Sequence, residues 1–263
     1  MRCVLSIAGS DSGAGAGIQA DIKTMAALGV YGLTAITAVT AQNTLGVTSF
    51  QILDRSLVEA QIDAVVTDFP VEAVKTGMLG NAEIIEIVAA KMKEYRLKKL
   101  VVDPVMVAKS GDALLEEGAR QALIKNLLPI ARVVTPNIPE AQVLAEMKIE
   151  TISDMKKAAR RIYRQGPSFV LVKGGHLEGS SQLTDVLFDG EQYGYYRAPR
   201  VKTSNTHGTG CTYGSAIASY LALGYNVPVA VKHARTYLQT ILHSGLSLGK
   251  GHGPMDHFGG TEQ

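Results

Sequence analysis

The chain has no tryptophan, only two cysteines and no long run of charge of one sign among its 263 residues. Two cysteines, Cys3 and Cys211, cannot build a disulfide framework or a cysteine-rich metal cluster. The net charge is +2 and the basic residues form only local pairs, so we expect no nucleic-acid partner. No apolar segment reaches the ~18 uninterrupted residues that span a bilayer, and the first apolar run stops at Gly9, too early for a typical signal peptide. These absences favour a protein of the reducing cytoplasm that binds no membrane.

Short apolar, β-branched segments alternate with segments of helical periodicity along most of the chain. The predicted strands are residues 4–8, 33–40, 73–76, 100–103, 132–135 and 169–173, with a hairpin of 184–188 and 192–196. The predicted helices include residues 18–28, 81–95, 114–128 and 153–164, and one more that begins near Cys211. The pattern predicts a single α/β domain over residues 1–263, in which helices flank both faces of a central, mostly parallel β-sheet.

Ligands of such sheets bind beyond the carboxyl ends of the strands, so the polar residues that end the strands are the first candidates for a site. The strongest local signal is the turn Gly208-Thr209-Gly210, which runs directly into an apolar helix at Cys211. Several backbone N–H groups at such a junction lack a partner and favour an anion, usually a phosphate. Cys211 either packs as a small apolar residue or acts on a substrate hydroxyl, because a helix N-terminus lowers the pKa of a thiol.

Other strand ends allow both a structural and a functional interpretation. The glycine-rich segment 9–17 is either a tight turn or a loop whose backbone approaches a ligand closely. Glu140, after Asn137 and Pro139, either favours the start of a helix or holds a hydrated Mg²⁺, and Asp103 allows the same two interpretations. Lys173 is either a solvated residue at the end of a strand or a cation for a transferring phosphate.

Taken in order, these motifs resemble the hydroxymethylpyrimidine/phosphomethylpyrimidine kinases of thiamine biosynthesis, a family of the ribokinase superfamily. The resemblance covers nearly the full length. The residues that carry it are Ala8-Gly9-Ser10-Asp11, Gly15 to Asp21, Ala41-Gln42-Asn43-Thr44, Lys75-Thr76-Gly77-Met78-Leu79, Val102-Asp103-Pro104-Val105-Met106, Thr135 to Ala141, Val172-Lys173-Gly174-Gly175-His176 and Thr206 to Thr212. It implies a ribokinase-like fold and two successive ATP-dependent phosphorylations. The first acts on 4-amino-5-hydroxymethyl-2-methylpyrimidine and the second on its monophosphate.

The resemblance also implies roles for individual residues, with ATP and Mg²⁺ as cofactors. The anion hole and catalytic turn would be formed by Gly208, Thr209, Gly210 and Cys211, and phosphate would be contacted by Asn137, Lys173 and Thr209. The metal would lie near Asp103 and Glu140. The pyrimidine edge would be bound by Gln42, its ring would pack on Met78 and Val105, and the pocket would be closed with the help of Gly9 and Asp21. Most sugar kinases of the superfamily have an aspartate, the general base, at the position of Cys211. The vitamin-precursor branch has a cysteine there, as this chain does. The order Gly13-Ala14-Gly15-Ala16-Gly17 departs from the commoner family order.

Several alternatives stay open at this point. A pyridoxal kinase of the same branch would phosphorylate a similar flat heteroaromatic alcohol, although Gln42 and Lys173 match the pyrimidine kinases. A non-catalytic sensor that binds the pyrimidine is more distant, and a dinucleotide oxidoreductase is the weakest alternative. We expect a small-molecule substrate and a homodimer. The six histidines show no metal-ligand spacing and receive no ligand role, and residues 249–254 receive no interpretation.

Overall fold

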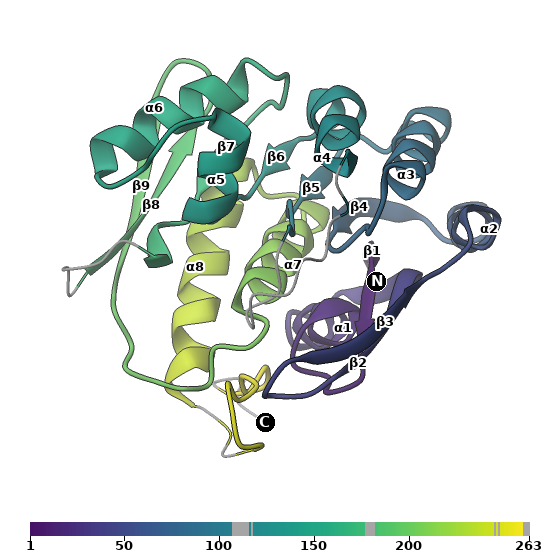
Figure 1. The fold of residues 1–263 in the computed structure, drawn as a ribbon, viewed down its shortest axis with the longest axis horizontal. Helices are drawn as coiled ribbons and strands as arrows, with labels where there is room; N and C mark the ends of the chain where they lie inside the picture. The colour runs from purple at the N-terminus through teal and green to yellow at the C-terminus, as the bar shows by residue number, and fades with distance from the viewer. Residues whose placement is uncertain (107–115, 117, 177–181, 245, 247, 260–263) are drawn as a thin grey trace.

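The computed structural model describes residues 1–106, 116, 118–176, 182–244, 246 and 248–259. Among these residues, nine strands form one sheet in the order β3-β2-β1-β4-β5-β6-β7-β8-β9 (Figure 1). Their bounds are β1 Cys3–Asp11, β2 Tyr31–Gln42, β3 Val47–Ile52, β4 Val71–Thr76, β5 Leu100–Val102, β6 Val133–Val134, β7 Val170–Val172, β8 Gln182–Phe188 and β9 Tyr193–Pro199. The predicted strands and the predicted hairpin are therefore confirmed, with ends that differ by a few residues.

The neighbouring strands β2, β1, β4, β5, β6 and β7 run parallel to one another. Antiparallel pairs occur only towards the two edges of the sheet, at β2–β3, β7–β8 and β8–β9. Central strands such as β4, β5 and β6 are buried on both faces, which explains their unbroken apolar sequences. The mostly parallel sheet predicted from the sequence is confirmed.

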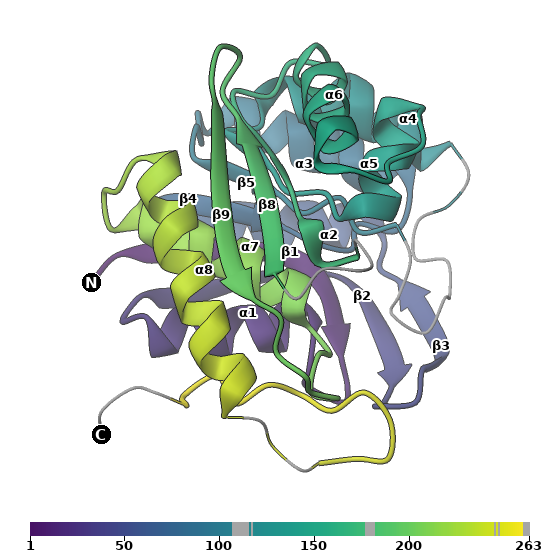
Figure 2. The ribbon, with the colours of Figure 1, turned by 90° about the vertical axis from the view of Figure 1, so that its left-hand side faces the viewer.

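Helices cover both faces of the sheet and create two hydrophobic cores. Helices α1, α7 and α8 pack on one face, where Val4, Val101 and Leu171 point, and α2 to α6 cover the other, with Leu5, Ile7 and Val102. Figure 2 shows α8 lying beside the β8–β9 hairpin. The helix bounds are α1 Gly17–Ala27, α2 Arg55–Val66, α3 Ala82–Glu94, α4 Ala119–Ala122, α5 Ile138–Ala145, α6 Ile152–Tyr163, α7 Thr209–Ala222 and α8 Val227–His243. In the part of the chain that the structure describes, no helix is long and apolar enough to span a membrane.

The helix predicted over residues 114–128 is wrong as a single α-helix. Residues 114, 115 and 117 lie outside the described part of the chain. The remainder forms the short α4, a π-helical turn η1 at Leu123–Leu127 and a 3-10 turn η2 at Leu128–Ile130. Pro129 lies in the first turn of η2, where its missing N–H group prevents continuation of the helical hydrogen-bond pattern. The periodicity reported the buried face correctly but could not detect these changes in helix type.

Candidate active site

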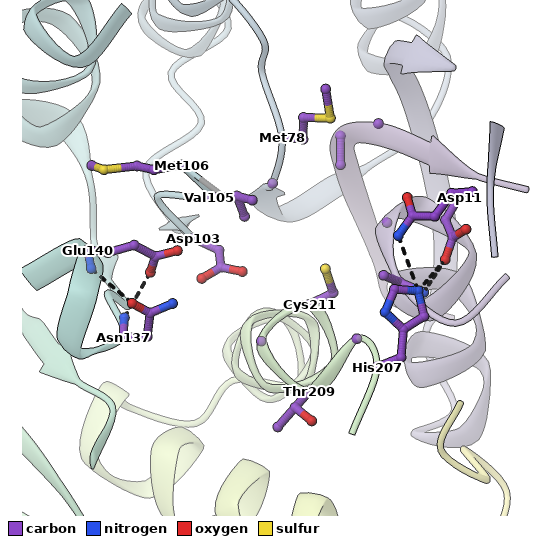
Figure 3. Close-up of a pocket in the computed structure, with 18 of the residues that line it drawn as sticks. Asp11, Met78, Asp103, Val105, Met106, Asn137, Glu140, His207, Thr209 and Cys211 are labelled. Atoms are coloured by element: carbon purple, nitrogen blue, oxygen red, sulfur yellow. Dashed lines mark hydrogen bonds and ion pairs between the residues drawn. The ribbon is translucent and has the colours of Figure 1, made fainter. Parts of the chain in front are cut away.

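A cavity of about 460 Å³ opens at the carboxyl edge of the parallel strands (Figure 3). Most of the site residues predicted from the sequence line this cavity: Gly9, Gln42, Met78, Asp103, Val105, Asn137, Glu140, Lys173, Gly208, Thr209, Gly210 and Cys211. These residues lie in or after the carboxyl-terminal parts of β1, β2, β4, β5, β6 and β7, or at the start of α7, so the sheet brings together residues that are far apart in the sequence. Asp21 does not line the cavity.

The N-terminus of α7 forms one wall of the cavity. Gly208 is its N-cap residue with φ of 80°, and no side chain caps the helix. A Cβ atom at Gly208 would lie 1.9 Å from the carbonyl oxygen of Gly15, so the turn also packs tightly against the glycine-rich loop. The Thr209 hydroxyl donates to the carbonyl of Thr206 and closes the turn. The N–H group of Thr209 donates to the carbonyl oxygen of Thr206 at 3.4 Å, and the N–H groups that follow it in the first turn of α7 are available to an anion.

A buried ion pair faces this helix terminus. Lys173 Nζ lies 2.8 Å from Asp103 Oδ1, which also accepts a hydrogen bond from the Thr135 hydroxyl. Burial alone would lower the pKa of Lys173, but the nearby carboxylates of Asp103 and Glu140 raise it, so the amine keeps its charge. A Cβ atom placed on Gly210 would lie 3.5 Å from both Asp103 Oδ2 and Lys173 Nζ. The lysine, the carboxylate and the helix terminus thus bound one small polar space.

Asn137 and Glu140 form a reciprocal capping box at the start of α5. The Asn137 side chain accepts from the Glu140 N–H at 2.9 Å, and the Glu140 carboxylate accepts from the Asn137 N–H at 2.8 Å. The structural interpretation of this motif is therefore correct. Burial and the charge of Asp103 raise the pKa of Glu140 to about 7, and the charge of Lys173 offsets part of this rise. An additional cation near Glu140 and Asp103 would favour both ionised carboxylates.

Cys211 lies in the first turn of α7, with its sulfur on the cavity side of the helix (Figure 3). Burial raises the pKa of the thiol to about 11, and the charges of Asp21 and Asp103 add to this effect. Lys75 and the N–H of Gly17 act in the opposite direction but do not compensate for the loss of water. The predicted lowering of this pKa is therefore wrong, because desolvation outweighs the helix terminus.

Asp21 belongs to a buried polar network beneath the cavity. Both of its carboxylate oxygens lie 2.9 Å from Lys75 Nζ, and the hydroxyl groups of Ser6 and Ser215 donate to it. All of these side chains are buried. The prediction that Asp21 helps to close the pocket is thus not supported, because its acceptor capacity is used inside the protein. The network instead joins β1, α1, β4 and α7 below the anion turn.

The opposite wall combines apolar side chains with an amide. Met78, Val105 and Met106 provide the apolar surface, and Figure 3 shows Met78 and Val105 above Cys211. A Cβ atom on Gly9 would lie 3.1 Å from Met78 Sδ, so the glycine leaves room for this sulfur. Gln42 stands at the end of β2 and contacts Thr40 and His207. A flat ring with a polar edge suits this wall.

Two residues of the site received no individual role from the sequence, although Asp11 was among the polar residues that follow the predicted strands. His207 and Asp11 both line the cavity and are 2.8 Å apart, between His207 Nε2 and Asp11 Oδ2. Metal-ligand spacing was the wrong test for His207, since its partner is a single carboxylate 196 residues away. The position of His207 directly before the anion turn and of Asp11 at the end of β1 was the available signal.

Comparisons with known proteins agree on one family. The family model described as phosphomethylpyrimidine kinase matches residues 11–256. The thiamine biosynthesis bifunctional protein ThiED of Geobacter sulfurreducens is 50% identical over 97% of this chain, which spans only 52% of that relative. The hydroxymethylpyrimidine/phosphomethylpyrimidine kinase of Bacillus subtilis is 46% identical over 97% of this chain and 94% of its own length.

Solved structures of a phosphomethylpyrimidine kinase and of a pyridoxal kinase are both similar to this chain. The phosphomethylpyrimidine kinase of Clostridium difficile is similar with a TM-score of 0.81 and 46% identity, over 90% of this chain and 98% of that one. The pyridoxal kinase of Staphylococcus aureus in complex with AMP-PCP and pyridoxal is similar with a TM-score of 0.90 and 36% identity, over 99% of this chain and 94% of that one.

Proposed function

Because this chain belongs to the phosphomethylpyrimidine kinase family, we propose that it phosphorylates 4-amino-5-hydroxymethyl-2-methylpyrimidine and then the monophosphate of that alcohol, with ATP as the donor. The observation that carries the proposal is the small polar space between the α7 terminus, Lys173 and Asp103, next to a wall of apolar side chains and Gln42. This arrangement provides a place for a transferring phosphoryl group beside a place for a flat ring.

The reaction needs position and charge neutralisation more than covalent help from the protein. The oxygen of the substrate hydroxyl attacks the γ-phosphorus, the bond to the β,γ-bridging oxygen breaks, and ADP leaves. The N–H groups at Gly208 to Cys211 and the ammonium of Lys173 stabilise the charge on the equatorial oxygens. Cys211 carries its proton at neutral pH, so the hydroxyl proton passes to an oxygen of the transferred phosphoryl group or to water rather than to a preformed thiolate.

The residues near Lys173 are suited to Mg²⁺. This ion prefers oxygen ligands and usually takes one or two carboxylates, with water and substrate phosphate completing its shell. Asp103 and Glu140 provide carboxylates, and a nearby cation would oppose the effect of burial, which raises the pKa of Glu140. Among the described residues, no cluster of three or more His, Cys, Asp or Glu side chains forms a closed metal cage, which fits a metal brought with the nucleotide. When bound, Mg²⁺ would neutralise charge on the phosphates.

The second phosphorylation uses the same site. The acceptor then enters with its phosphate in the place of the former hydroxyl, and the polar space beside Gly210 is bounded by Lys173 rather than by apolar atoms. Pyridoxal is the second candidate substrate, since a pyridoxal kinase has a closely similar fold. Gln42 favours the aminopyrimidine, because a primary amide offers both a donor and an acceptor to an adjacent ring nitrogen and amino group.

ATP consumption separates these candidates. The purified protein is given ATP with the pyrimidine alcohol, with pyridoxal, and with neither, and ADP is measured. We expect rapid turnover with the pyrimidine alcohol and two ADP per alcohol at completion. Turnover with pyridoxal alone would establish the second candidate, and no turnover with either would support the non-catalytic sensor.

Replacement of Gln42 by Leu tests the substrate assignment. Leu leaves the polar ring edge without partners in a dry pocket, which costs about 1–3 kcal/mol, or ~5- to 150-fold in specificity. The ratio of kcat/KM for the aminopyrimidine to kcat/KM for pyridoxal should fall by that factor. An unchanged ratio would remove Gln42 from ring recognition. Gln51→Leu is a matched control, because Gln51 lies exposed on β3 away from the cavity.

Three properties of the whole protein extend the proposal. One sheet includes strands from Cys3 to Pro199, which supports a single domain and predicts one cooperative unfolding transition. The exposed apolar side chains of Leu45 and Phe50, beside the open edge of β3, support a homodimer, which sedimentation would detect. Cytoplasmic localisation remains a proposal, consistent with free thiols at Cys3 and Cys211.

A further inference from the structure

Four polar side chains meet at the wall of the cavity where the ring is proposed to bind. His207 Nε2 lies 2.8 Å from Asp11 Oδ2 and 3.3 Å from Gln42 Nε2. On the other side of the amide, Gln42 Oε1 lies 3.1 Å from the Thr40 hydroxyl. Figure 3 shows the Asp11–His207 contact beside Cys211. All four residues line the cavity, but only Gln42 has a role in the proposed function.

Asp11 determines where the proton of His207 lies. The Asp11 carboxylate accepts hydrogen bonds from the N–H groups of Gly13, Gly15 and Ala16. Burial alone would raise the pKa of Asp11, but the hydrogen bonds from His207 and the backbone hold it below its usual value. An ionised carboxylate only accepts hydrogen bonds. His207 Nε2 must therefore carry a hydrogen and donate it to Asp11, whether the ring is neutral or charged.

The proton on His207 decides which end of the Gln42 amide faces the ring. With the nitrogen of the amide towards His207, two donors face each other at 3.3 Å. The Thr40 hydroxyl would also have to share one hydrogen between Gln42 Oε1 and the carbonyl of Ser10, 3.0 Å away. The two ends of a carboxamide have the same shape, so hydrogen bonding alone assigns them. A 180° rotation of the amide removes the contact between two donors and leaves the Thr40 hydrogen to Ser10 alone, while the hydrogen on His207 Nε2 is shared between Asp11 and Gln42.

In the rotated amide every group has a partner. The oxygen of Gln42 accepts from His207 Nε2–H, which Asp11 shares, and the amide nitrogen donates to the Thr40 hydroxyl. That hydroxyl then gives its single hydrogen to the carbonyl of Ser10. Such satisfied chains are favoured over partly satisfied ones in a site with little water. The remaining lone pair and N–H of the amide stay available to a ligand.

We propose that His207, oriented by Asp11, and Thr40 are positioning residues that fix the Gln42 amide with its oxygen towards His207 and its nitrogen towards Thr40. They thereby set the order of hydrogen-bond acceptor and donor that the cavity presents to the edge of a heteroaromatic ring. The inference rests on the proposed function only in taking Gln42 as the residue that contacts this edge. A ring with its donor and acceptor in the matching order, as in an aminopyrimidine, is bound. The reverse order places donor against donor and acceptor against acceptor.

The glycine-rich loop has the shape that this arrangement needs. A Cβ atom on Gly15 would lie 2.3 Å from His207 Cδ2, so only a glycine allows the imidazole to reach Asp11 here. The backbone N–H of His207 donates to the carbonyl of Gly253 at 3.1 Å and anchors the residue from the other side. The glycine at position 15 thus has a structural reason in this chain.

Nuclear magnetic resonance tests the amide orientation without any reaction. In the ¹⁵N-labelled protein, the side-chain NH₂ protons of Gln42 should show nuclear Overhauser contacts to the Thr40 methyl group. These contacts should be stronger than those to the His207 ring. Long-range ¹H–¹⁵N spectra should show a hydrogen on Nε2 of His207. Stronger contacts of the NH₂ protons to His207, or an unprotonated Nε2, would overturn the proposal even if the protein had no kinase activity.

Kinetics tests the consequence for selectivity. His207→Phe keeps an aromatic ring but removes the N–H that donates to Gln42. Thr40→Val removes the hydroxyl that accepts from the amide nitrogen. Each should raise KM for the aminopyrimidine alcohol by ~10-fold or more, with a smaller change in kcat. The preference over pyridoxal should fall by a similar factor. His207→Gln retains an N–H at a similar reach and should keep selectivity within about threefold of wild type. His252→Phe, an exposed histidine outside the cavity, is the matched control.

The outcomes separate the inference from the proposed function. A wild-type protein that phosphorylates neither alcohol would contradict the function, while the amide orientation would still be decided by resonance spectra. A wild-type protein with the expected activity whose selectivity survives in both His207→Phe and Thr40→Val would overturn the inference alone. Loss of selectivity in His207→Gln as great as in His207→Phe would show that the imidazole acts by shape rather than by its hydrogen.

Discussion

At the scale of single residues, removal from water changes the pKa of a side chain more than a nearby helix terminus does. Cys211 occupies a helix terminus that would lower the pKa of an exposed thiol. Its sulfur nevertheless lies inside the cavity rather than at the surface, and burial raises its pKa to about 11. The sequence correctly identified the position of the thiol but not its protonation, because burial depends on the packing of the whole fold around the helix terminus.

The pH dependence of alkylation tests this protonation. With a raised pKa, Cys211 is almost wholly a thiol at pH 7, so iodoacetamide should react slowly and the rate should rise with pH well beyond 8.5. The rate is followed by mass spectrometry in a Cys3→Ala background, since Cys3 is the other free cysteine. A rate that reaches its plateau below pH 8 would restore the thiolate that the helix terminus alone predicts.

A second prediction at this scale concerns Glu140, because burial stabilises the neutral form of its carboxyl group. The folded protein binds more protons at Glu140 than the unfolded chain does between pH 4.5 and about 7, so its contribution to stability is lost as pH rises through this window. Glu140→Gln keeps an acceptor for the Asn137 N–H and removes the buried charge. We expect it to increase the free energy of unfolding at pH 8 by at most about 3 kcal/mol, with little change at pH 4.5, while kinase activity falls.

Thermal unfolding without nucleotide or Mg²⁺ measures this difference. Glu191→Gln, at an exposed position, is the control and should change the melting temperature at neither pH. If Glu140→Gln were less stable than wild type at pH 8, the attraction of Glu140 to Lys173 would outweigh the cost of its burial.

At the scale of elements, the glycines at the start of α7 have different tasks. Gly208 has a positive φ and no space for a Cβ atom, which would lie 1.9 Å from Gly15 O. Gly210 has space, because its Cβ atom would lie 3.5 Å from Asp103 and Lys173, an ordinary contact. We therefore expect Gly208→Ala to unfold or strongly destabilise the protein. Gly210→Ala should retain its melting temperature within a few degrees but place a methyl group in the polar space and reduce kcat by ~10-fold or more.

Chemical denaturation and steady-state kinetics of the two variants check this contrast. Gly175→Ala is the control, since nothing lies within 4 Å of its Cβ position. Normal turnover in Gly210→Ala would show that no phosphate oxygen occupies the space between the helix terminus and Lys173.

The same elements show how far sequence patterns lead. Apolar runs and strand-end polar residues sufficed to predict the parallel sheet and most residues of the cavity, because both depend on local composition. The edge strand β3 was not predicted, since its residues are mostly exposed and lack an apolar run. The Asp21–Lys75 pair and the Asp11–His207 pair could not be predicted either, because each joins residues from separate elements whose packing fixes the contact.

At the scale of the whole molecule, the C-terminal segment joins the two sides of the cavity. The Thr44 hydroxyl, on the loop after β2, accepts from the N–H groups of Lys250 and Gly251 at 3.1 Å. On the side of α7, the N–H of His207 donates to Gly253 O, and the hydroxyl of Thr212 lies 3.0 Å from His257 Nε2. Residues 249–254, which had no interpretation in the sequence, thus connect the loop that follows Gln42 to the anion turn.

His257 makes the attachment of this segment dependent on pH. Burial, with a smaller contribution from the charge of Lys23, lowers the pKa of His257 to about 4. The folded protein therefore binds fewer protons at His257 than the unfolded chain between about pH 4 and 6.5, so stability falls as pH falls through this window. Glu140 has the opposite slope over nearly the same range, so the two effects offset one another in a global unfolding curve.

Local hydrogen exchange separates them, because His257 and Glu140 lie on different parts of the molecule. We expect amide protection of residues 248–259 to decrease between pH 6.5 and 5, after correction for intrinsic exchange rates, by at most about 2 kcal/mol. His257→Gln can still bond to Thr212 and does not titrate, so its protection should be independent of pH. Glu140→Gln and His243→Gln, an exposed histidine near the end of α8, should behave like wild type in this segment. A pH-dependent loss of protection that persists unchanged in His257→Gln would mean that another group releases the segment in acid.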